Sequence, residues 1–165
     1  MAKVNEEGPI RWFTAALRVR YQETDQMGVV YHSNYLQWME IGRTEMIRAM
    51  GYSYSEIEAA GLLLPVVDLD IQYKQPARYD DEIVVFTSIT AFSPLRIQYR
   101  YEVRRMSKLD PAPSIEVQWK DGGDLPGELL VTGSTRHVWV NREWKPARLD
   151  KSLPELYAAL RNSLD

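Results

Sequence analysis

A carboxylate, a glycine turn and a histidine lie close together near the start of the chain. Asp25 precedes Gly28, and His32 follows seven residues after the aspartate. A carboxylate can attack an electrophilic carbon or take a proton from water, and an imidazole can orient a substrate or carry a proton. This spacing predicts acid–base or nucleophilic chemistry at residues 25–32.

Each of these residues also has an ordinary structural interpretation. An aspartate before a glycine is commonly a turn former, and a histidine before a helix is commonly a cap or a surface residue. Glu23, Asp25 and His32 can be imagined as metal ligands, but nothing in their spacing requires a metal. We therefore expect no metal site and no cofactor. The second histidine, His137, lies in a predicted strand and is expected to be structural.

These residues come directly before a predicted helix. Ser33 or Asn34 can cap its N-terminus, apolar residues recur at helical spacing from Tyr35, and Gly51 is a typical helix stop. Gly28 permits backbone angles that a β-carbon disfavours. Because the helix is apolar around much of its circumference, we expect the rest of the fold to enclose it.

Alternating patterns predict an antiparallel sheet for most of the remaining chain. From Leu95 to Arg104, apolar residues alternate strictly with charged or polar ones, which is typical of a sheet covered on one side. Further strands are expected at residues 17–22, 65–77, 81–92, 114–119 and 127–141, and further helices at residues 52–61 and near the C-terminus. One long helix followed by a run of strands predicts an α+β domain.

Length and composition fit one globular domain. The chain has 165 residues, of which 45% are hydrophobic, and its formal net charge is -3. This charge argues against a broad cationic surface for nucleic acid. The absence of cysteine excludes disulfides, Cys-based zinc sites and thiolate nucleophiles. No segment approaches the ~20 apolar residues of a transmembrane span, and the N-terminus lacks a signal peptide's apolar stretch. We therefore expect a soluble, cytoplasmic protein.

Several longer motifs resemble one enzyme family, the hotdog-fold acyl-CoA thioesterases of the 4-hydroxybenzoyl-CoA thioesterase-like, YbgC-type group. The matching stretches, in order, are "RYQETDQMGVVYHSNYLQWMEIGRTE", "YKQPARYDDEI", "TRHVWV" and "PARL". The match covers residues 17–150. The segment "SKLDPAPSIEVQWKDGGDLPGE" is longer than the usual hairpin at that place in the family.

The resemblance implies a fold, an activity and site residues. The fold is the hotdog fold, in which an antiparallel sheet curls around one long central helix, here with a short second helix and a C-terminal helix. The activity is hydrolysis of an acyl-CoA to a free acid and CoA. The key carboxylate of the family corresponds to Asp25, and a tyrosine and a histidine of the site correspond to Tyr21 and His32. Members assemble as dimers or tetramers with active sites at the subunit interface.

The residues suit this chemistry. The first amides of a helix lack intrahelical partners and lie at the positive end of its dipole, so amides near Tyr31–Ser33 can stabilise an oxyanion. Asp25 can act as a nucleophile or as a general base, and the sequence leaves both routes open. The expected substrate-binding residues are Gly28, Val30, Tyr31, Asn34 and Arg78, although Asn34 can equally be a helix cap. Candidate cations for the CoA phosphates are Lys74, Arg78, Arg96 and Arg104.

We accordingly expect an N-terminal arm at residues 1–16, a hotdog thioesterase domain at 17–145 and a C-terminal tether and helix at 146–165. The expected partners are an acyl-CoA substrate and further copies of the chain, in a dimer or a homotetramer. Two other functions stay open: an enoyl-thioester hydratase or dehydratase, and a non-catalytic protein that binds acyl thioesters. A serine hydrolase is not expected, because the chain has no G-x-S-x-G motif.

Overall fold

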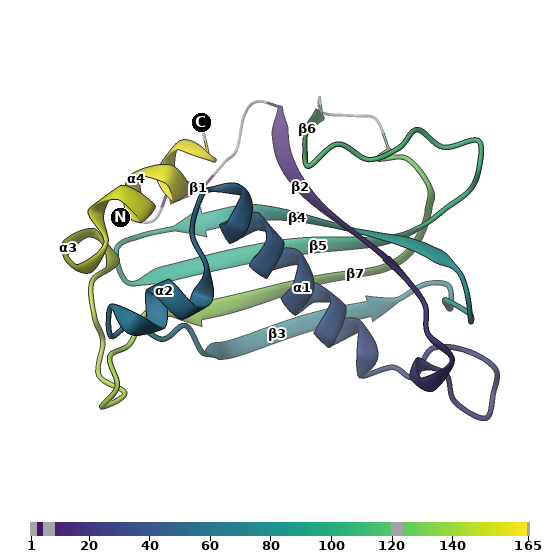
Figure 1. Ribbon diagram of the computed structural model, residues 1–165, viewed down its shortest axis with the longest axis horizontal. Helices are drawn as coiled ribbons and strands as arrows, with labels where there is room; N and C mark the ends of the chain where they lie inside the picture. The colour runs from purple at the N-terminus through teal and green to yellow at the C-terminus, as the bar shows by residue number, and fades with distance from the viewer. Residues whose placement is uncertain (1–2, 5–8, 120–123, 165) are drawn as a thin grey trace.

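The main feature of the structure is a long helix packed against a curled sheet (Figure 1). The structure is a computed structural model that describes residues 3–4, 9–119 and 124–164. The helices are α1 (Asn34–Ala49), α2 (Tyr54–Ala59), α3 (Leu149–Ser152) and α4 (Pro154–Asn162), with a 3-10 helix at Tyr21–Glu23. The strands are β1 (Lys3–Val4), β2 (Ile10–Arg18), β3 (Val66–Tyr73), β4 (Glu82–Phe92), β5 (Arg96–Met106), β6 (Glu116–Trp119) and β7 (Glu128–Val138).

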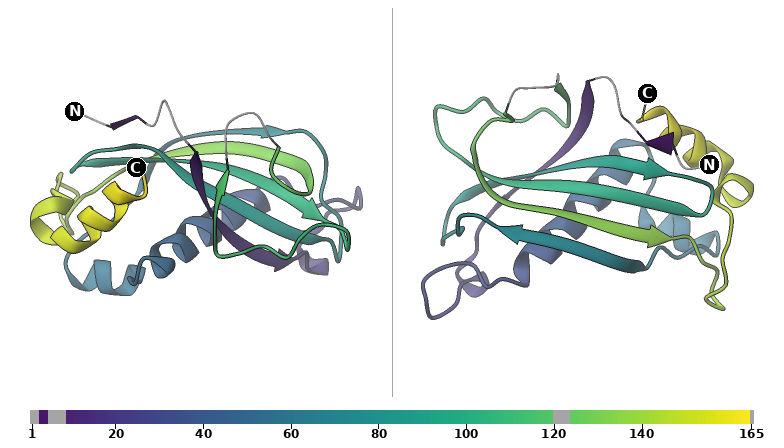
Figure 2. Two further views of the ribbon diagram at one scale, coloured as in Figure 1. Left: turned by 90° about the horizontal axis from the view of Figure 1, so that it is seen from above. Right: turned by 180° about the vertical axis from the view of Figure 1, so that it is seen from behind.

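The strands form one antiparallel sheet. Its order within the described residues is β3-β7-β5-β4-β2-β6, and β1 pairs with β4. Figure 2 shows α1 lying against one face of the curled sheet. The predicted α+β hotdog architecture is therefore confirmed.

Helix α1 is held by its buried face. Trp38, Met39 and Met46 are at most 1% exposed. Gly42 allows close approach to β4, because a β-carbon there would lie 2.5 Å from Thr87 Oγ1 and 2.9 Å from a methyl carbon of Val85. The helix thus lies against the sheet along most of its length and presents its N-terminal end to one edge of the molecule.

Strand β2 begins earlier than its sequence pattern indicates. It starts at Ile10, so residues 10–16, expected in the N-terminal arm, belong to the sheet, while residues 1–2 and 5–8 of that arm lie outside the described part of the chain. The alternation is hidden because both faces are covered: Phe13 faces the main core, and Trp12 joins a second buried cluster.

The long connection before β7 covers the second cluster, which consists of Trp12, Val84, Phe86 and Leu125. Arg104, only 5% exposed, fixes this connection by donating to the carbonyl oxygens of Leu125 at 2.9 Å and Gly127 at 3.0 Å. The expected short strand in this segment is β6, which pairs with β2.

Strand β3 differs from the predicted pattern of one buried face. Every residue of β3 except Ile71 is exposed in the single chain, including Val67 at 59% and Leu69 at 46%. Among the described strands β3 lies at the edge of the sheet, and α1 lies mainly against β2, β4 and β5, so the helix leaves most of β3 uncovered.

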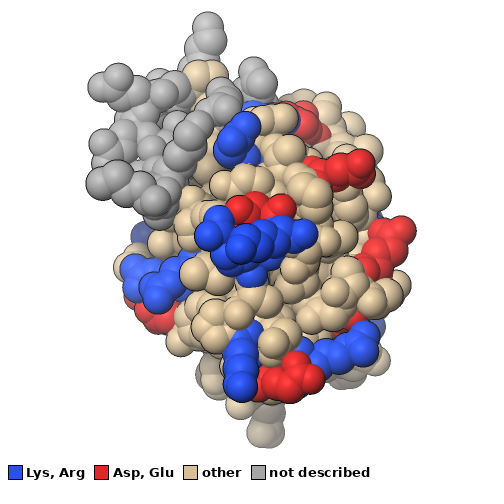
Figure 3. All heavy atoms as spheres, turned by 90° about the vertical axis from the view of Figure 1, so that its left-hand side faces the viewer, with Lys and Arg blue, Asp and Glu red and all other residues tan. Residues whose placement is uncertain are grey.

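The C-terminal segment forms two short helices instead of one. Pro154 begins α4 directly after Leu153 ends α3, because proline cannot donate a backbone hydrogen bond. Basic and acidic side chains are interspersed on this end of the molecule (Figure 3), with Arg148 and Asp150 paired at 2.7 Å. Within the described residues, no helix has the length and apolar character needed to cross a bilayer.

Candidate active site

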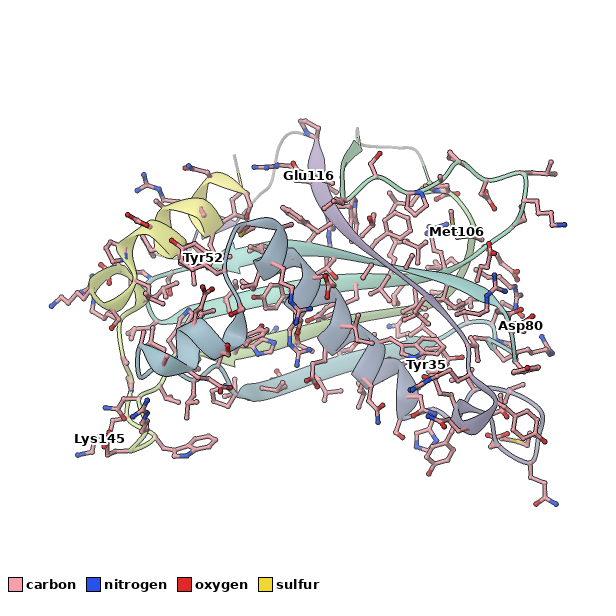
Figure 4. The ribbon with its side chains drawn as sticks, viewed as in Figure 1. Tyr35, Tyr52, Asp80, Met106, Glu116 and Lys145 are labelled. Carbon is pink, nitrogen blue, oxygen red and sulfur yellow. The ribbon has the colours of Figure 1, made fainter. Side chains whose placement is uncertain are left out.

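A cleft of about 280 Å³ opens where the loop after β2 meets the end of β3. The loop supplies one wall, formed by Asp25, Met27, Val29, Val30, Tyr31 and His32. The other wall is formed by Tyr35 of α1 and by Tyr73, Lys74, Gln75 and Pro76 at and after the end of β3. Figure 4 shows Tyr35 at the end of α1 that faces this loop.

Asp25 sits at the start of a tight turn within the loop. Its amide donates to Val29 O at 2.9 Å, and its carbonyl oxygen accepts from Gly28 N at 3.0 Å. Gly28 has a φ of 78°, which a side chain rarely adopts. The Asp25 carboxylate accepts a hydrogen bond from Met27 N at 2.8 Å through Oδ1. The turn therefore fixes the backbone of Asp25 at the wall of the cleft and engages one of its two carboxylate oxygens.

The start of α1 supplies amides without acceptors. Of the range predicted to stabilise an oxyanion, Tyr31 N already donates to Glu23 O at 2.9 Å and is not free. No described acceptor contacts the amides of His32 and Ser33, which lie just before the first turn of the helix. Of the three amides predicted to stabilise an oxyanion, those of His32 and Ser33 remain candidates.

Two tyrosine hydroxyl groups link the elements that line the cleft. Tyr73 donates to His32 O at 2.8 Å, and Tyr35 accepts from Ala77 N at 2.9 Å. Burial raises the pKa of both the Tyr35 and the Tyr73 phenols, so both stay protonated at neutral pH. The link from Tyr73 joins the edge strand to the start of α1 beside Asp25.

A comparison with known protein families shows the family to which the chain belongs. The family model of the thioesterase-like superfamily matches residues 19–160. The chain belongs to this superfamily. The predicted resemblance is confirmed, and the protein is a thioester hydrolase of the hotdog fold.

Relatives of this thioesterase match most of its length. YneP of Bacillus subtilis (strain 168), named as a proposed acyl-CoA thioesterase, is 39% identical over 87% of this chain and 91% of its own. The acyl-CoA thioesterase YbgC of Haemophilus influenzae is 30% identical over 68% of this chain and 84% of its own. The crystal structure of a DHNA-CoA thioesterase from Staphylococcus aureus superimposes with a TM-score of 0.77 at 34% identity, covering 92% of this chain and 89% of its own.

The thioesterase cleft contains some of the predicted site residues and not others. Asp25, Val30, Tyr31 and His32 line it, with His32 exposed and its ring 4.4 Å from that of Tyr31. Tyr21 does not line the cleft of the single chain; it is 77% exposed, and its ring packs edge-on against Tyr79.

Three predicted substrate-binding residues lie behind or beside the lining. Gly28 shapes the turn. Asn34 is the first residue of α1, and its side chain donates to Glu23 O at 2.8 Å, so it ties the helix to the loop instead of capping the helix. Arg78 is exposed and outside the lining, whereas Lys74 lines the cleft. Lys74 was one of four candidate cations, and sequence position alone did not distinguish it from the others.

Glu23 was named from the sequence only as an imaginable metal ligand and not as a residue of the catalytic site. It is 5% exposed, and its carboxylate accepts from Arg20 N at 2.8 Å and from Trp38 Nε1 at 2.7 Å. Burial alone raises the pKa of Glu23, but these hydrogen bonds and the Arg20 guanidinium outweigh it and hold the pKa below its usual value. Its position two residues before Asp25 was the available signal.

Among the described residues, no three His, Cys, Asp or Glu side chains gather as a metal site.

Proposed function

We propose that this thioesterase hydrolyses acyl-CoA thioesters in the cleft beside Asp25. The main support for the proposal is that Asp25 and His32 line the same cleft, and that the amides of His32 and of the next residue, Ser33, are not engaged by a described acceptor. The relatives named above as acyl-CoA and DHNA-CoA thioesterases support CoA esters as the substrate class. Lys74 at the cleft is suited to the phosphates of CoA.

The proposed reaction places the thioester carbonyl between Asp25 and the amides of His32 and Ser33. Asp25 takes a proton from water while the water oxygen bonds to the carbonyl carbon. The carbonyl oxygen gains negative charge and accepts hydrogen bonds from the two amides, a kind of contact worth about 3–4 kcal/mol of barrier in other enzymes. The C–S bond then breaks, and the CoA thiolate takes the proton from Asp25.

A second route uses the same carboxylate as a nucleophile. Asp25 attacks the carbonyl carbon, the thiolate leaves, and water hydrolyses the mixed anhydride. Quenching a single turnover with hydroxylamine distinguishes the routes, because attack on the anhydride can leave a hydroxamate on Asp25 that peptide mass analysis detects. In the base route, Asp25 stays unmodified.

The proposed active form is a dimer that joins through β3. The edge of this strand is open, and its apolar side chains are exposed in the single chain. Such an edge is a ready surface for pairing with another strand. Because Tyr73 ends β3 and lines the cleft, a second copy on this edge lies next to the site. The tetramer is the larger form of the same proposal, built from two such dimers.

The function is tested with a panel of acyl-CoAs that covers short and medium aliphatic chains and aromatic groups such as 1,4-dihydroxy-2-naphthoyl. A thiol reporter measures CoA release, and absorbance follows the double bond of enoyl-CoA substrates. The proposal predicts thiol release. Loss of the enoyl absorbance without thiol would identify a hydratase, and tight binding without any turnover would identify a carrier.

A further inference from the structure

The Glu23 carboxylate is buried in an enzyme whose proposed reaction does not use it. It faces α1 and does not line the cleft. Its Oε1 accepts from Arg20 N at 2.8 Å and, more weakly, from Arg20 Nε at 3.3 Å, while its Oε2 accepts from Trp38 Nε1 at 2.7 Å. Trp38 is itself only 1% exposed. Both carboxylate oxygens are therefore acceptors for N–H groups of the protein.

The main chain of the same residue makes a second set of links. Glu23 O accepts from Tyr31 N at 2.9 Å and from Asn34 Nδ2 at 2.8 Å. The side chain thus ties the beginning of the loop to α1, and the carbonyl ties it to the end of the loop and to the first residue of the helix.

These links close the base of the turn that carries Asp25. Thr24 and Val30 form an antiparallel bridge directly inside the Glu23–Tyr31 hydrogen bond, and Asp25 N donates to Val29 O inside that bridge. A shift of Glu23 relative to α1 therefore moves the Asp25 carboxylate relative to the amides at the helix start.

We propose that Glu23 is a positioning residue, which holds the Asp25 carboxylate at a fixed distance from the His32 and Ser33 amides by anchoring the loop to Trp38. This inference rests on the proposed thioesterase function only for its catalytic consequence; the anchoring itself is a property of the fold. Misplacing a reacting group by about 1 Å can cost a factor of about 100 in rate.

The substitution Glu23→Gln is a sharp test because it is nearly isosteric. Each carboxylate oxygen faces an N–H donor, so the amide group of glutamine must turn its own N–H₂ toward one of them. One contact becomes donor against donor. Trp38→Phe removes the indole donor, so the double variant E23Q/W38F can place its amide group there without that conflict. We expect the double variant to be less impaired than E23Q alone.

Glu102→Gln is the matched control. Glu102 is also a partly buried carboxylate bonded to an arginine, Arg104, at 2.7 Å, but it lies on β5 outside the lining of the cleft. If Glu23 only stabilised the fold, E23Q and E102Q would both lower the melting temperature and keep the wild-type kcat per folded molecule. If Glu23 is a positioning residue, the E23Q substitution lowers kcat and leaves KM close to the wild-type value.

The experiment measures kcat, KM and amide hydrogen exchange for the wild type, E23Q, W38F, E23Q/W38F and E102Q. We expect kcat to fall about 100-fold in E23Q, less in W38F, and not in E102Q. We expect exchange at residues 24–31 to become at least about tenfold faster in E23Q, with the strands of the sheet unchanged.

Two results would overturn the inference: wild-type exchange at residues 24–31 in E23Q, or equal losses of kcat in E23Q and E102Q. Exchange needs no substrate, so it separates the inference from the proposed function. A wild-type chain that releases no thiol would refute the function, while faster exchange in E23Q alone would still support the anchor.

Discussion

Asp25 and its neighbours in the cleft reach the site by two different routes along the chain. Asp25, Val30, Tyr31 and His32 come from one continuous loop, so the family resemblance of that single stretch of sequence was enough to predict them together. Tyr73 joins them only because β3 and the loop meet in three dimensions. No local spacing marks such a residue, which is why Tyr73 was not predicted and Lys74 was only one of four candidate cations.

Lys74 gives a prediction about substrate binding. It is the lysine that lines the cleft, and a cation there favours the phosphates of CoA. In Lys74→Ala, KM for acyl-CoA should rise several-fold while kcat stays close to the wild-type value, with less dependence of KM on ionic strength because salt screens exposed charges. Lys145→Ala is the control, since Lys145 lies at the opposite end of the molecule (Figure 4). Equal KM values for the two variants would contradict the role of Lys74.

His137 gives a prediction about pH. It is 1% exposed and lies 2.7 Å from Thr135 Oγ1, and burial together with the Arg43 guanidinium lowers its pKa to about 4. In the unfolded chain its pKa is ordinary, near 6.5. Between these two values the unfolded state binds the extra proton, so the free energy of unfolding decreases as pH falls from about 6.5 to about 4.

The expected size of this effect is up to about 3 kcal/mol. Urea unfolding of the wild type and of His137→Gln across pH 4–7 measures it, and the variant should lose most of the dependence in this window. His32→Gln is the control, because His32 is exposed. A pH dependence that is identical in the wild type and His137→Gln would exclude His137 as its source.

At the scale of elements, periodicity succeeds where one face is buried and fails where burial departs from that pattern. Helix α1 was predicted because its apolar residues recur at helical spacing and face the sheet. The start of β2 was missed because both of its faces are covered. The one-sided burial expected for β3 is absent because α1 leaves most of this edge strand uncovered.

The fit of α1 on the sheet depends on Gly42. Replacing a helical glycine with alanine normally stabilises a helix by about 1 kcal/mol. Here the new β-carbon would meet Thr87 and Val85, which are short side chains on a buried strand and cannot move far. Gly42→Ala should therefore lower the free energy of unfolding by about 1–3 kcal/mol. A urea titration decides this, and an increase in stability would show that α1 does not approach β4 so closely.

At the scale of the whole molecule, only the family resemblance predicted assembly into oligomers. The alternation of apolar and polar residues does not predict it, because an edge strand and a central strand can show the same alternation. The structure places the exposed apolar side chains of β3 beside the cleft, which supports the proposed dimer. The second cluster on the opposite face is already covered by the chain's own connection.

The dimer is tested by charge at the edge strand. Leu69→Lys puts a cation on β3, where Leu69 is 46% exposed, and should reduce the mass in solution from that of a dimer or tetramer to a smaller species. Leu109→Lys is the matched control, because Leu109 is 96% exposed in the connection after β5. Light scattering measures both. A monomeric wild type, or equal masses for all three proteins, would refute assembly through β3.

The most direct test of the account is the rate of thiol release by Asp25→Ala compared with the wild type and with Asp150→Ala. Asp150 is paired with Arg148 in the C-terminal segment and serves as the control. If Asp25 activates water or attacks the thioester, its variant should lose about 10²- to 10⁴-fold in kcat while keeping the wild-type fold. Asp150→Ala should keep wild-type kcat. Full activity in a folded Asp25→Ala variant would contradict the central claim.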